Sequence, residues 1–564
     1  MVGVVLTLRT PLALLAVLMA GLAAAPAAPA ATERPGALEM VLQDDAQLLH
    51  RPEPELRASL ERLRSLGVDR VRISANWSVL TRDASSEQRP ADFDAADPAA
   101  YEQARWRELD RAVRLTNEYG LRAMIDIAFW APRWASVDPA GERGRSEVDP
   151  KEFAAFSAAV ARRYSGEFTV PVDVAPAPPN EDEDELDKLF GDNEPEPEGP
   201  QPATPAPPLP RVDVFTLWNE PNHTGFLRPQ WVRDGNTFRP RSPEIYRAMV
   251  LAAYPAVKAA SPQATVLVGA TSGSGDHSGR GVSGVAPLRF LRELACVDAK
   301  LKPLTTPACA NFRPLPGDAW SHHPYSMTNT PDTPSGKRRP DSVSMADLPR
   351  LASTLDRLAA AGRIAPALRD IWVTEYGYET NPPSKISRYG VGDQARFLAW
   401  GEYLAWRVPQ VKSYAQFLLR DLPPGADRVG ASLKRPFGEW YSGLEFSDGK
   451  PKLAMEAFRS GLFVERLRGR RLRFWGRLRL DPGPRTVTVE MRRTGGSPWV
   501  ALTTLARGKV GAAKQVTVDG RGVLHRTASR APRGRAVRFR LRIEGGGGTR
   551  LSPSVTAVDP RPDS

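Results

Sequence analysis

The 564-residue sequence predicts an α/β protein: a (β/α)8 (TIM) barrel followed by a small antiparallel β-sandwich domain. Between residues 37 and 463, a short apolar run followed by an amphipathic stretch recurs eight times. Alternating units of this kind predict a parallel sheet, and eight of them over roughly 430 residues fit a closed barrel. From residue 465 to 560 the pattern changes to short β-branched runs separated by Gly and Pro, which is typical of a β-sandwich.

The eight strand–helix units follow one another along the chain. In the first helix, Leu56, Leu60 and Leu63 recur at helical spacing, and Gly67 follows as a C-terminal cap. The expected strands lie at about residues 38–42, 71–73, 121–128, 212–217, 265–270, 319–322, 370–374 and 413–418. The expected helices lie at about residues 56–66, 101–119, 150–164, 242–260, 287–297, 344–361, 394–407 and 453–463. An open, doubly wound sheet is the alternative, but the Gly-rich phosphate turn that normally follows its first strand is missing here.

Two segments differ in composition from the barrel pattern. Residues 1–31 contain Arg9, then an apolar run over 11–25, then Ala-rich and Pro-rich sequence, and this order predicts a signal peptide. An N-terminal membrane anchor is the alternative, and no later stretch is apolar enough to span a bilayer. Residues 171–210 contain 12 prolines and an acidic run, which predicts a disordered insertion. We therefore expect an exported protein, secreted or at the cell surface.

The positive charge of the chain is concentrated at its C-terminal end. The formal net charge is +12, and from residue 465 onward there are 23 Lys and Arg against 7 Asp and Glu. Such a domain could bind an anionic polysaccharide or the cell envelope, or it could simply present a solvated Arg-rich surface. No nucleic-acid-binding motif accompanies the charge, so nucleic acid is not an expected partner.

The cysteine content predicts one disulfide bond. Cys296 and Cys309 are the two cysteines of the chain, and they flank a Pro-containing loop. An exported protein permits them to form a structural disulfide. Two cysteines without a suitably spaced histidine do not predict a metal site, and nothing in the sequence predicts a cofactor.

Two expected strands end on a glutamate. The run over 212–217 leads into Trp218-Asn219-Glu220-Pro221, and Pro221 cannot continue a central strand. The strand over 370–374 leads into Glu375, and Gly377 permits a sharp exit. A capped strand end is the structural explanation for either residue alone. Because reactive groups of a barrel come from the carboxyl ends of different strands, the pair predicts a site with two facing carboxylates, as cleavage of a glycosidic bond requires.

With these motifs, residues 37–463 resemble clan A glycoside hydrolases, the (β/α)8 group that includes families 5 and 39. Trp218-Asn219-Glu220-Pro221 is similar to the acid/base motif on strand four of these enzymes, and Thr374-Glu375-Tyr376-Gly377 to the nucleophile on strand seven. The resemblance implies that Glu220 is the general acid/base and Glu375 the nucleophile. It also implies that the anomeric configuration is retained through a glycosyl-enzyme intermediate.

The same resemblance implies roles for three neighbouring side chains. Asn219 would hydrogen-bond the 2-hydroxyl of the sugar. Tyr325, in His323-Pro324-Tyr325, would orient the nucleophile, and Arg72 would keep the nucleophile ionised. Packing is the alternative role for Tyr325, and a barrel-interior or surface charge is the alternative for Arg72.

Further candidates for substrate binding are a histidine and three tryptophans. His322 and His323 are adjacent in a strand and point to opposite faces, so only one can face the site, and we expect it to be His323. Trp77, Trp130 and Trp440 are candidate platforms for sugar rings, with core packing as the alternative.

The chain departs from the clan A pattern at two strand ends. Phe129 and Trp130 stand after strand three, where many members carry a histidine, and Gln416-Phe417-Leu418 stands near the usual place of a tryptophan after strand eight. These departures leave the substrate and the nearest family open. The predicted function is an exported retaining glycoside hydrolase that cleaves β-linked O-glycosidic bonds in a poly- or oligosaccharide. The alternative is a catalytically silent carbohydrate-binding or envelope protein on the same barrel.

Overall fold

The computed structural model of the chain describes residues 38–136, 144–171, 207–276, 283–423, 440–469, 471–479, 486–493, 496–502, 516–517, 522–528, 537–545 and 548–559. The expected signal peptide lies outside these residues, as does most of the expected insertion at 171–210. Its last residues are described, and Leu209 is buried in the barrel core, so the expected disorder does not extend to this residue. In the described part of the chain, every helix is too short or too polar to cross a bilayer.

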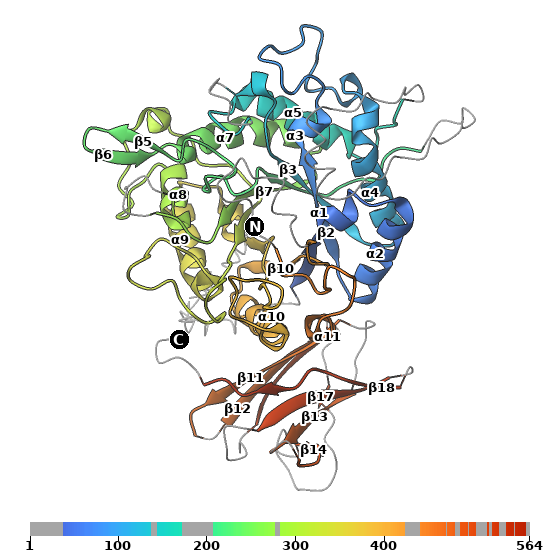
Figure 1. Ribbon diagram of the computed structural model, residues 1–564. Helices are drawn as coiled ribbons and strands as arrows, with labels where there is room; N and C mark the ends of the chain where they lie inside the picture. Colours follow the sequence, from blue (N-terminus) through green and yellow to red (C-terminus); the bar gives the residue numbers. More distant parts are fainter. Residues whose placement is uncertain are drawn as a thin grey trace, which may run out of the picture.

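Eight parallel strands form a closed barrel, which confirms the predicted fold class (Figure 1). They follow one another around the barrel in sequence order, and the last pairs with the first. The strands are β1 (Glu39–Gln43), β2 (Arg70–Asn76), β3 (Arg122–Ala128), β4 (Val214–Leu217), β7 (Thr265–Ser272), β8 (Ala319–His323), β9 (Ile371–Val373) and β10 (Val411–Phe417). Because helices cover the outside and side chains fill the inside, almost every strand residue is buried, which explains the continuous apolar runs.

The outer layer consists of the eight predicted helices, and some of them begin or end at other residues than predicted. They are α2 (Glu53–Ser65), α4 (Arg107–Glu118), α5 (Pro150–Arg163), α7 (Ser242–Ala260), α8 (Pro287–Leu294), α9 (Leu348–Ala360), α10 (Val391–Trp406) and α11 (Leu453–Arg459). The helix expected over 101–119 begins only at Arg107, because short 3-10 turns, η1 (Pro98–Ala100) and η2 (Gln103–Trp106), precede it. Other short elements are α1 (Asp45–Leu48), α3 (Trp77–Leu80), and the hairpin of β5 (Trp231–Asp234) and β6 (Thr237–Pro240).

The C-terminal domain consists of two antiparallel sheets that share an apolar core, as the predicted β-sandwich requires. One sheet contains β11 (Ser460–Leu467), β12 (Arg471–Leu478) and β16 (Val523–Ala528). The other contains β14 (Val500–Ala501), β13 (Thr486–Arg492), β17 (Arg538–Gly545) and β18 (Gly548–Leu551), with β15 (Val516–Thr517) and β19 (Val555–Thr556) attached. The last barrel helix, expected to reach residue 463, ends at Arg459, and the sandwich begins at Ser460 because Leu462 and Val464 already alternate into its core.

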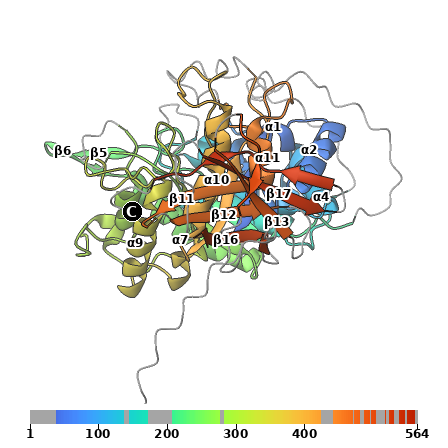
Figure 2. The same cartoon turned by 90° about the horizontal axis from the view of Figure 1, so that it is seen from below.

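The first sheet of the sandwich packs against the barrel, and the second lies on the far side (Figures 1 and 2). Trp475 on β12 lies 6.2 Å from Trp406 on α10, measured between ring centroids. Next to these rings, the Arg479 guanidinium forms an ion pair with Glu402, and both side chains are almost completely buried. The interface therefore combines a contact between tilted aromatic rings with a buried charge pair.

We expect the Glu402→Ala substitution to lower the free energy of unfolding by about 3–5 kcal/mol, because it leaves the buried guanidinium of Arg479 without its partner. Glu456→Ala is the matched control, since Glu456 forms an exposed pair with Arg459 and such pairs contribute about 0–1 kcal/mol. Urea denaturation of both variants measures the difference. Equal losses would show that the Glu402 pair does not hold the domains together.

The disulfide bond joins Cys296 and Cys309, as predicted. It closes a short loop after α8, and Arg247 and Arg363 donate hydrogen bonds to the carbonyl groups of Leu294 and Ala295 at the end of this helix. Side chains thus satisfy carbonyl groups that have no partner within the helix.

Candidate active site

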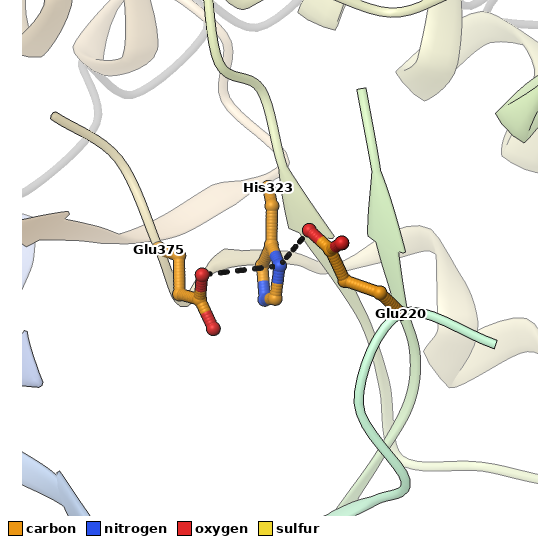
Figure 3. A group of neighbouring side chains, drawn as sticks. All are labelled: Glu220, His323 and Glu375. Atoms are coloured by element: carbon orange, nitrogen blue, oxygen red, sulfur yellow. Dashed lines mark hydrogen bonds and ion pairs between the residues drawn. The ribbon is translucent and has the colours of Figure 1, made fainter. Parts of the chain in front are cut away.

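The two predicted glutamates face one another at the carboxyl ends of the strands (Figure 3). Glu220 lies three residues beyond the end of β4, and Glu375 lies two residues beyond the end of β9. Together with a ring nitrogen of His323, one carboxylate oxygen of each residue belongs to a group of atoms within 4.8 Å of one another. A partly buried acid and a buried acid from distant parts of the chain therefore share one small volume.

The backbone around Glu220 is strained, and this conformation directs the Glu220 side chain toward Glu375 and His323. Trp218 and Glu220 have positive φ angles of 66° and 38°, which cost about 1–3 kcal/mol at a residue other than glycine. Hydrogen bonds from their backbone N–H groups to the carbonyl groups of Ile127 and Ala270 hold this conformation. The Trp218 indole is buried and donates a hydrogen bond to the carbonyl of Phe226.

A glycine shapes the chain after Glu375. A Cβ atom at Gly377 would lie 2.5 Å from the carbonyl oxygen of Phe417 at the end of β10. Only glycine therefore lets the chain pass the end of β10 at this distance.

Arg72 lies at the centre of the site, on β2, and is completely buried. Its Nη1 atom donates hydrogen bonds to Glu375 Oε1 at 2.7 Å and to the Gln43 side chain. Its Nη2 atom donates a hydrogen bond to Asn219 Oδ1 at 3.0 Å and lies 2.9 Å from Asp126 Oδ2. The guanidinium thus connects Glu375 with the residue that precedes Glu220.

Tyr325 and His323 lie on the other side of the carboxylates. The Tyr325 hydroxyl donates a hydrogen bond to Glu375 Oε2 at 3.2 Å. His323 Nδ1 lies 3.0 Å from Glu220 Oε1 and 3.6 Å from Glu375 Oε2, and its Nε2 lies 3.0 Å from Thr374 Oγ1 (Figure 3). The His322 ring contacts Thr271 and the Val343 carbonyl instead. Of the two histidines, His323 is therefore the one beside the carboxylates.

The surroundings make the two glutamates chemically different. Burial, and then the charge of Glu375, raise the pKa of Glu220 well above its usual value. Burial also raises the pKa of Glu375, but the Arg72 charge and the hydrogen bonds from Arg72 and Tyr325 oppose this rise. Glu375 thus accepts hydrogen bonds from a guanidinium and a hydroxyl, whereas Glu220 contacts the ring of His323, and this difference favours the proton of the pair on Glu220. Burial lowers the pKa of His323 well below its usual value, so its ring is neutral.

The three candidate tryptophans lie in different places. Trp440 lies beside the site, with its ring 5.5 Å from that of Tyr325 and 5.3 Å from that of Phe417. Trp130 follows β3, is partly exposed, and donates a hydrogen bond to the Gly225 carbonyl. The role of both rings as platforms for sugars stays a prediction.

The prediction for Trp77 is wrong. Its ring is 0% exposed and stacks on Phe156 of α5 at 5.2 Å. Trp77 begins α3, the short helix directly after β2, and packs against α5 in the layer outside the barrel. A ring in this position cannot reach a sugar in the barrel mouth.

Sequence reasoning missed two residues of the site, Gln43 and Asp126. Both hold Arg72, and both lie in strands that were otherwise predicted correctly. A signal existed for Asp126, because a carboxylate inside an apolar strand is rare unless it is paired. Which cation would pair with it could not be known, because β2 and β3 meet only in the folded chain.

Within the described residues, Glu220, His323 and Glu375 form a group that could hold a metal ion. The argument from residue spacing in the sequence did not foresee this group, because its members come from three strands that the fold brings together. Arg72 lies 2.7 Å from Glu375, and its positive charge opposes the binding of a second cation there.

Comparison with known proteins leaves the family undetermined. No protein-family model matches the chain, and no curated protein matches it. One solved structure, described as a glycoside hydrolase, covers 90% of this chain and 95% of its own length with 9% identity and a TM-score of 0.38. Another, whose title concerns the pneumococcal virulence factor StrH and N-glycan recognition and hydrolysis, covers 42% of this chain and 53% of its own, with 9% identity and a TM-score of 0.21. These likenesses carry no functional argument, which must come from the site.

Proposed function

We propose that this protein is an exported retaining glycoside hydrolase that cleaves β-linked O-glycosidic bonds in a poly- or oligosaccharide. The observation that carries the proposal is that the two neighbouring carboxylates have different hydrogen-bond partners. Glu375 has the donors Arg72 and Tyr325, whereas Glu220 has neither and holds the proton. Hydrolysis of a glycoside by double displacement needs one ionised and one protonated carboxyl group next to each other in the site.

The proposed reaction has two steps. In the first, a Glu375 oxygen attacks the anomeric carbon while the bond to the leaving oxygen breaks and Glu220 transfers its proton to that oxygen. In the second, Glu220 takes a proton from water, the water oxygen attacks the anomeric carbon, and the ester bond to Glu375 breaks. Carboxyl oxygens within 4.8 Å support retention, since inverting enzymes separate the two groups by about 6.5–9.5 Å to admit a water molecule.

The neighbouring residues have supporting roles in this proposal. Arg72 and Tyr325 stabilise Glu375 as an anion. Because the Asn219 carbonyl oxygen accepts a hydrogen bond from Arg72, the amide N–H groups of Asn219 are left to donate to the sugar 2-hydroxyl. His323 orients Glu220, and Trp440 and Trp130 provide faces for sugar rings.

A catalytically silent carbohydrate-binding protein is the alternative, and a substrate panel separates the two. We expect the wild-type chain to hydrolyse at least one member of a panel of β-linked oligosaccharides, also in the presence of EDTA. Proton NMR during the reaction should show the β-anomer as the first product. The double variant Glu220→Gln/Glu375→Gln is the control. Equal rates for wild type and control would favour the silent protein, loss of activity in EDTA would favour a metal enzyme, and the α-anomer would contradict retention.

We also propose the domain functions that the sequence suggests. Residues 1–31 are a signal peptide, the barrel predicted over 37–463 is the catalytic domain, and the sandwich predicted over 465–560, which begins at Ser460, is an accessory domain. The solvent-facing side of its second sheet carries Arg492, Arg538, Arg540 and Arg542. The guanidinium groups of Arg492 and Arg540 lie over the Trp499 ring. Glu490 and Glu544 pair with Arg540 and Arg542, so the arginines exceed the acids on this face, and the excess positive charge is complementary to an anionic polysaccharide.

Removal of two of these charges tests the accessory domain. We expect Arg538→Ala/Arg542→Ala to weaken binding to polygalacturonate roughly twofold to thirtyfold, since each exposed ion pair contributes about 0.2–1 kcal/mol. Arg57→Ala/Arg64→Ala removes two exposed charges from α2 and is the matched control. Sedimentation assays at several salt concentrations measure the affinity. Equal affinity of both variants, or preference for DNA over polygalacturonate, would contradict the proposal.

A further inference from the structure

Asp126 is a completely buried carboxylate in the wall of the barrel, below the two glutamates. It lies on β3, where it is opposite Ser74 on β2 and Thr216 on β4. Its Oδ2 atom lies 2.9 Å from Arg72 Nη2, and its Oδ1 atom accepts a hydrogen bond from the Thr216 hydroxyl. The proposed reaction assigns this residue no role.

The contacts of Arg72 show what Asp126 does there. Nη1 is held by Glu375 and Gln43, and Nη2 is held by Asn219 and Asp126. Asp126 is the one partner of Nη2 that carries a negative charge, and it comes from the strand next to β2. Without that charge Nη2 would keep only the neutral Asn219 oxygen as its partner, and the guanidinium would be held less firmly beside Asn219.

The balance of charges around Arg72 also indicates a role for Asp126. The titratable or charged groups around Asp126 and Glu375 are Asp45, Arg72, Glu220, Tyr246, His323 and Tyr325. Arg72 is the single cation of this group, because the His323 ring is neutral and the tyrosines are uncharged. Its charge therefore interacts with three carboxylates, most strongly with Asp126 and Glu375 and less strongly with Asp45.

We propose that Asp126 is a positioning residue for the reaction, which holds the Arg72 guanidinium between Glu375 and Asn219 and takes up part of its charge. This proposal rests on the proposed glycosidase function. A nucleophilic carboxylate must be ionised, yet it must not be so strongly stabilised that it attacks slowly. By sharing the arginine, Asp126 leaves Glu375 ionised with more of its nucleophilicity.

The Asp126→Asn substitution tests the proposal through the pH profile. Because the Asp126 charge raises the pKa of Glu375, its removal should shift the acid limb of kcat/KM toward lower pH. We expect kcat to fall on the order of 10²-fold, as for other displacements of a catalytic contact by about 1 Å. A purely structural role predicts lower stability with an unmoved acid limb.

Asp213→Asn is a matched control, because Asp213 forms an ion pair with Arg70, two residues before Arg72 on the same strand. It should leave kcat and the pH profile unchanged. If Asp126→Asn does not fold, Asp126→Ser, which leaves space for water, replaces it. An unmoved acid limb, or equal effects at positions 126 and 213, would overturn the proposal. Failure of the proposed function is recognised separately, because the wild-type chain would then hydrolyse no member of the panel.

Discussion

The Glu375→Gln substitution is expected to abolish hydrolysis, with a loss in kcat on the order of 10⁴–10⁶-fold, as for the removal of other catalytic nucleophiles. An amide cannot form the glycosyl ester, whereas it keeps the size of the carboxylate. Its single oxygen can still accept the hydrogen bond from Arg72, and its NH2 group can donate to the Tyr325 hydroxyl. The fold should therefore persist while the chemistry stops. Steady-state kinetics with the best substrate of the panel, together with thermal unfolding, check both statements.

A second variant identifies the role of Glu375 more closely. Glu375→Ala leaves a space in which azide can attack the anomeric carbon directly, and we expect a glycosyl azide of inverted configuration. Asp370→Asn is the matched control, because Asp370 precedes the same strand at its opposite end and forms an exposed pair with Lys412. Activity of Glu375→Gln equal to that of Asp370→Asn would remove Glu375 from the mechanism.

The Glu220→Gln substitution is expected to lower kcat/KM by roughly 10²–10⁴-fold for natural substrates, the usual contribution of a general acid. In an aryl glycoside of a strongly acidic phenol, the aryloxide leaves without being protonated. The first step of the reaction should therefore remain fast with this substrate. Deglycosylation should then limit the rate, and azide should accelerate it, because this anion needs no general base. The product should be a glycosyl azide of retained configuration.

The pH dependence of the same variant checks the proton donor. In the wild-type chain, activity should fall at low pH as Glu375 becomes protonated and at high pH as Glu220 loses its proton. Because burial raises the pKa of both carboxyl groups, the optimum should lie above the range of ordinary glutamates. The two limbs belong to the coupled pair. With the aryl substrate, Glu220→Gln should lose the basic limb, and a basic limb that persists would assign the proton to another group.

Much of the fold could be predicted because its signals are local. Apolar runs and helical periodicity located all eight strand–helix units, and a change in pattern located the sandwich. The predicted ends of helices and strands were less accurate. At Ser460, for example, the apolar residues that follow could belong either to the end of a helix or to the start of a strand. Trp77 was assigned to the site for a similar reason, since sequence alone does not show on which side of the barrel wall a ring lies.

The sequence by itself determined the types of chemical group at the strand ends: the carboxylates of Glu220 and Glu375 and the hydroxyl of Tyr325. Only the tertiary structure decided which of them meet and in which protonation state. Arg72 and Glu375 are far apart in the chain, and the fold brings them together at the barrel mouth. Burial there raises the pKa of both carboxyl groups, and hydrogen bonds from Arg72 and Tyr325 oppose this rise at Glu375. The tertiary structure also decided the place of Asp126, because the pairing of β2 with β3 brings it to Arg72.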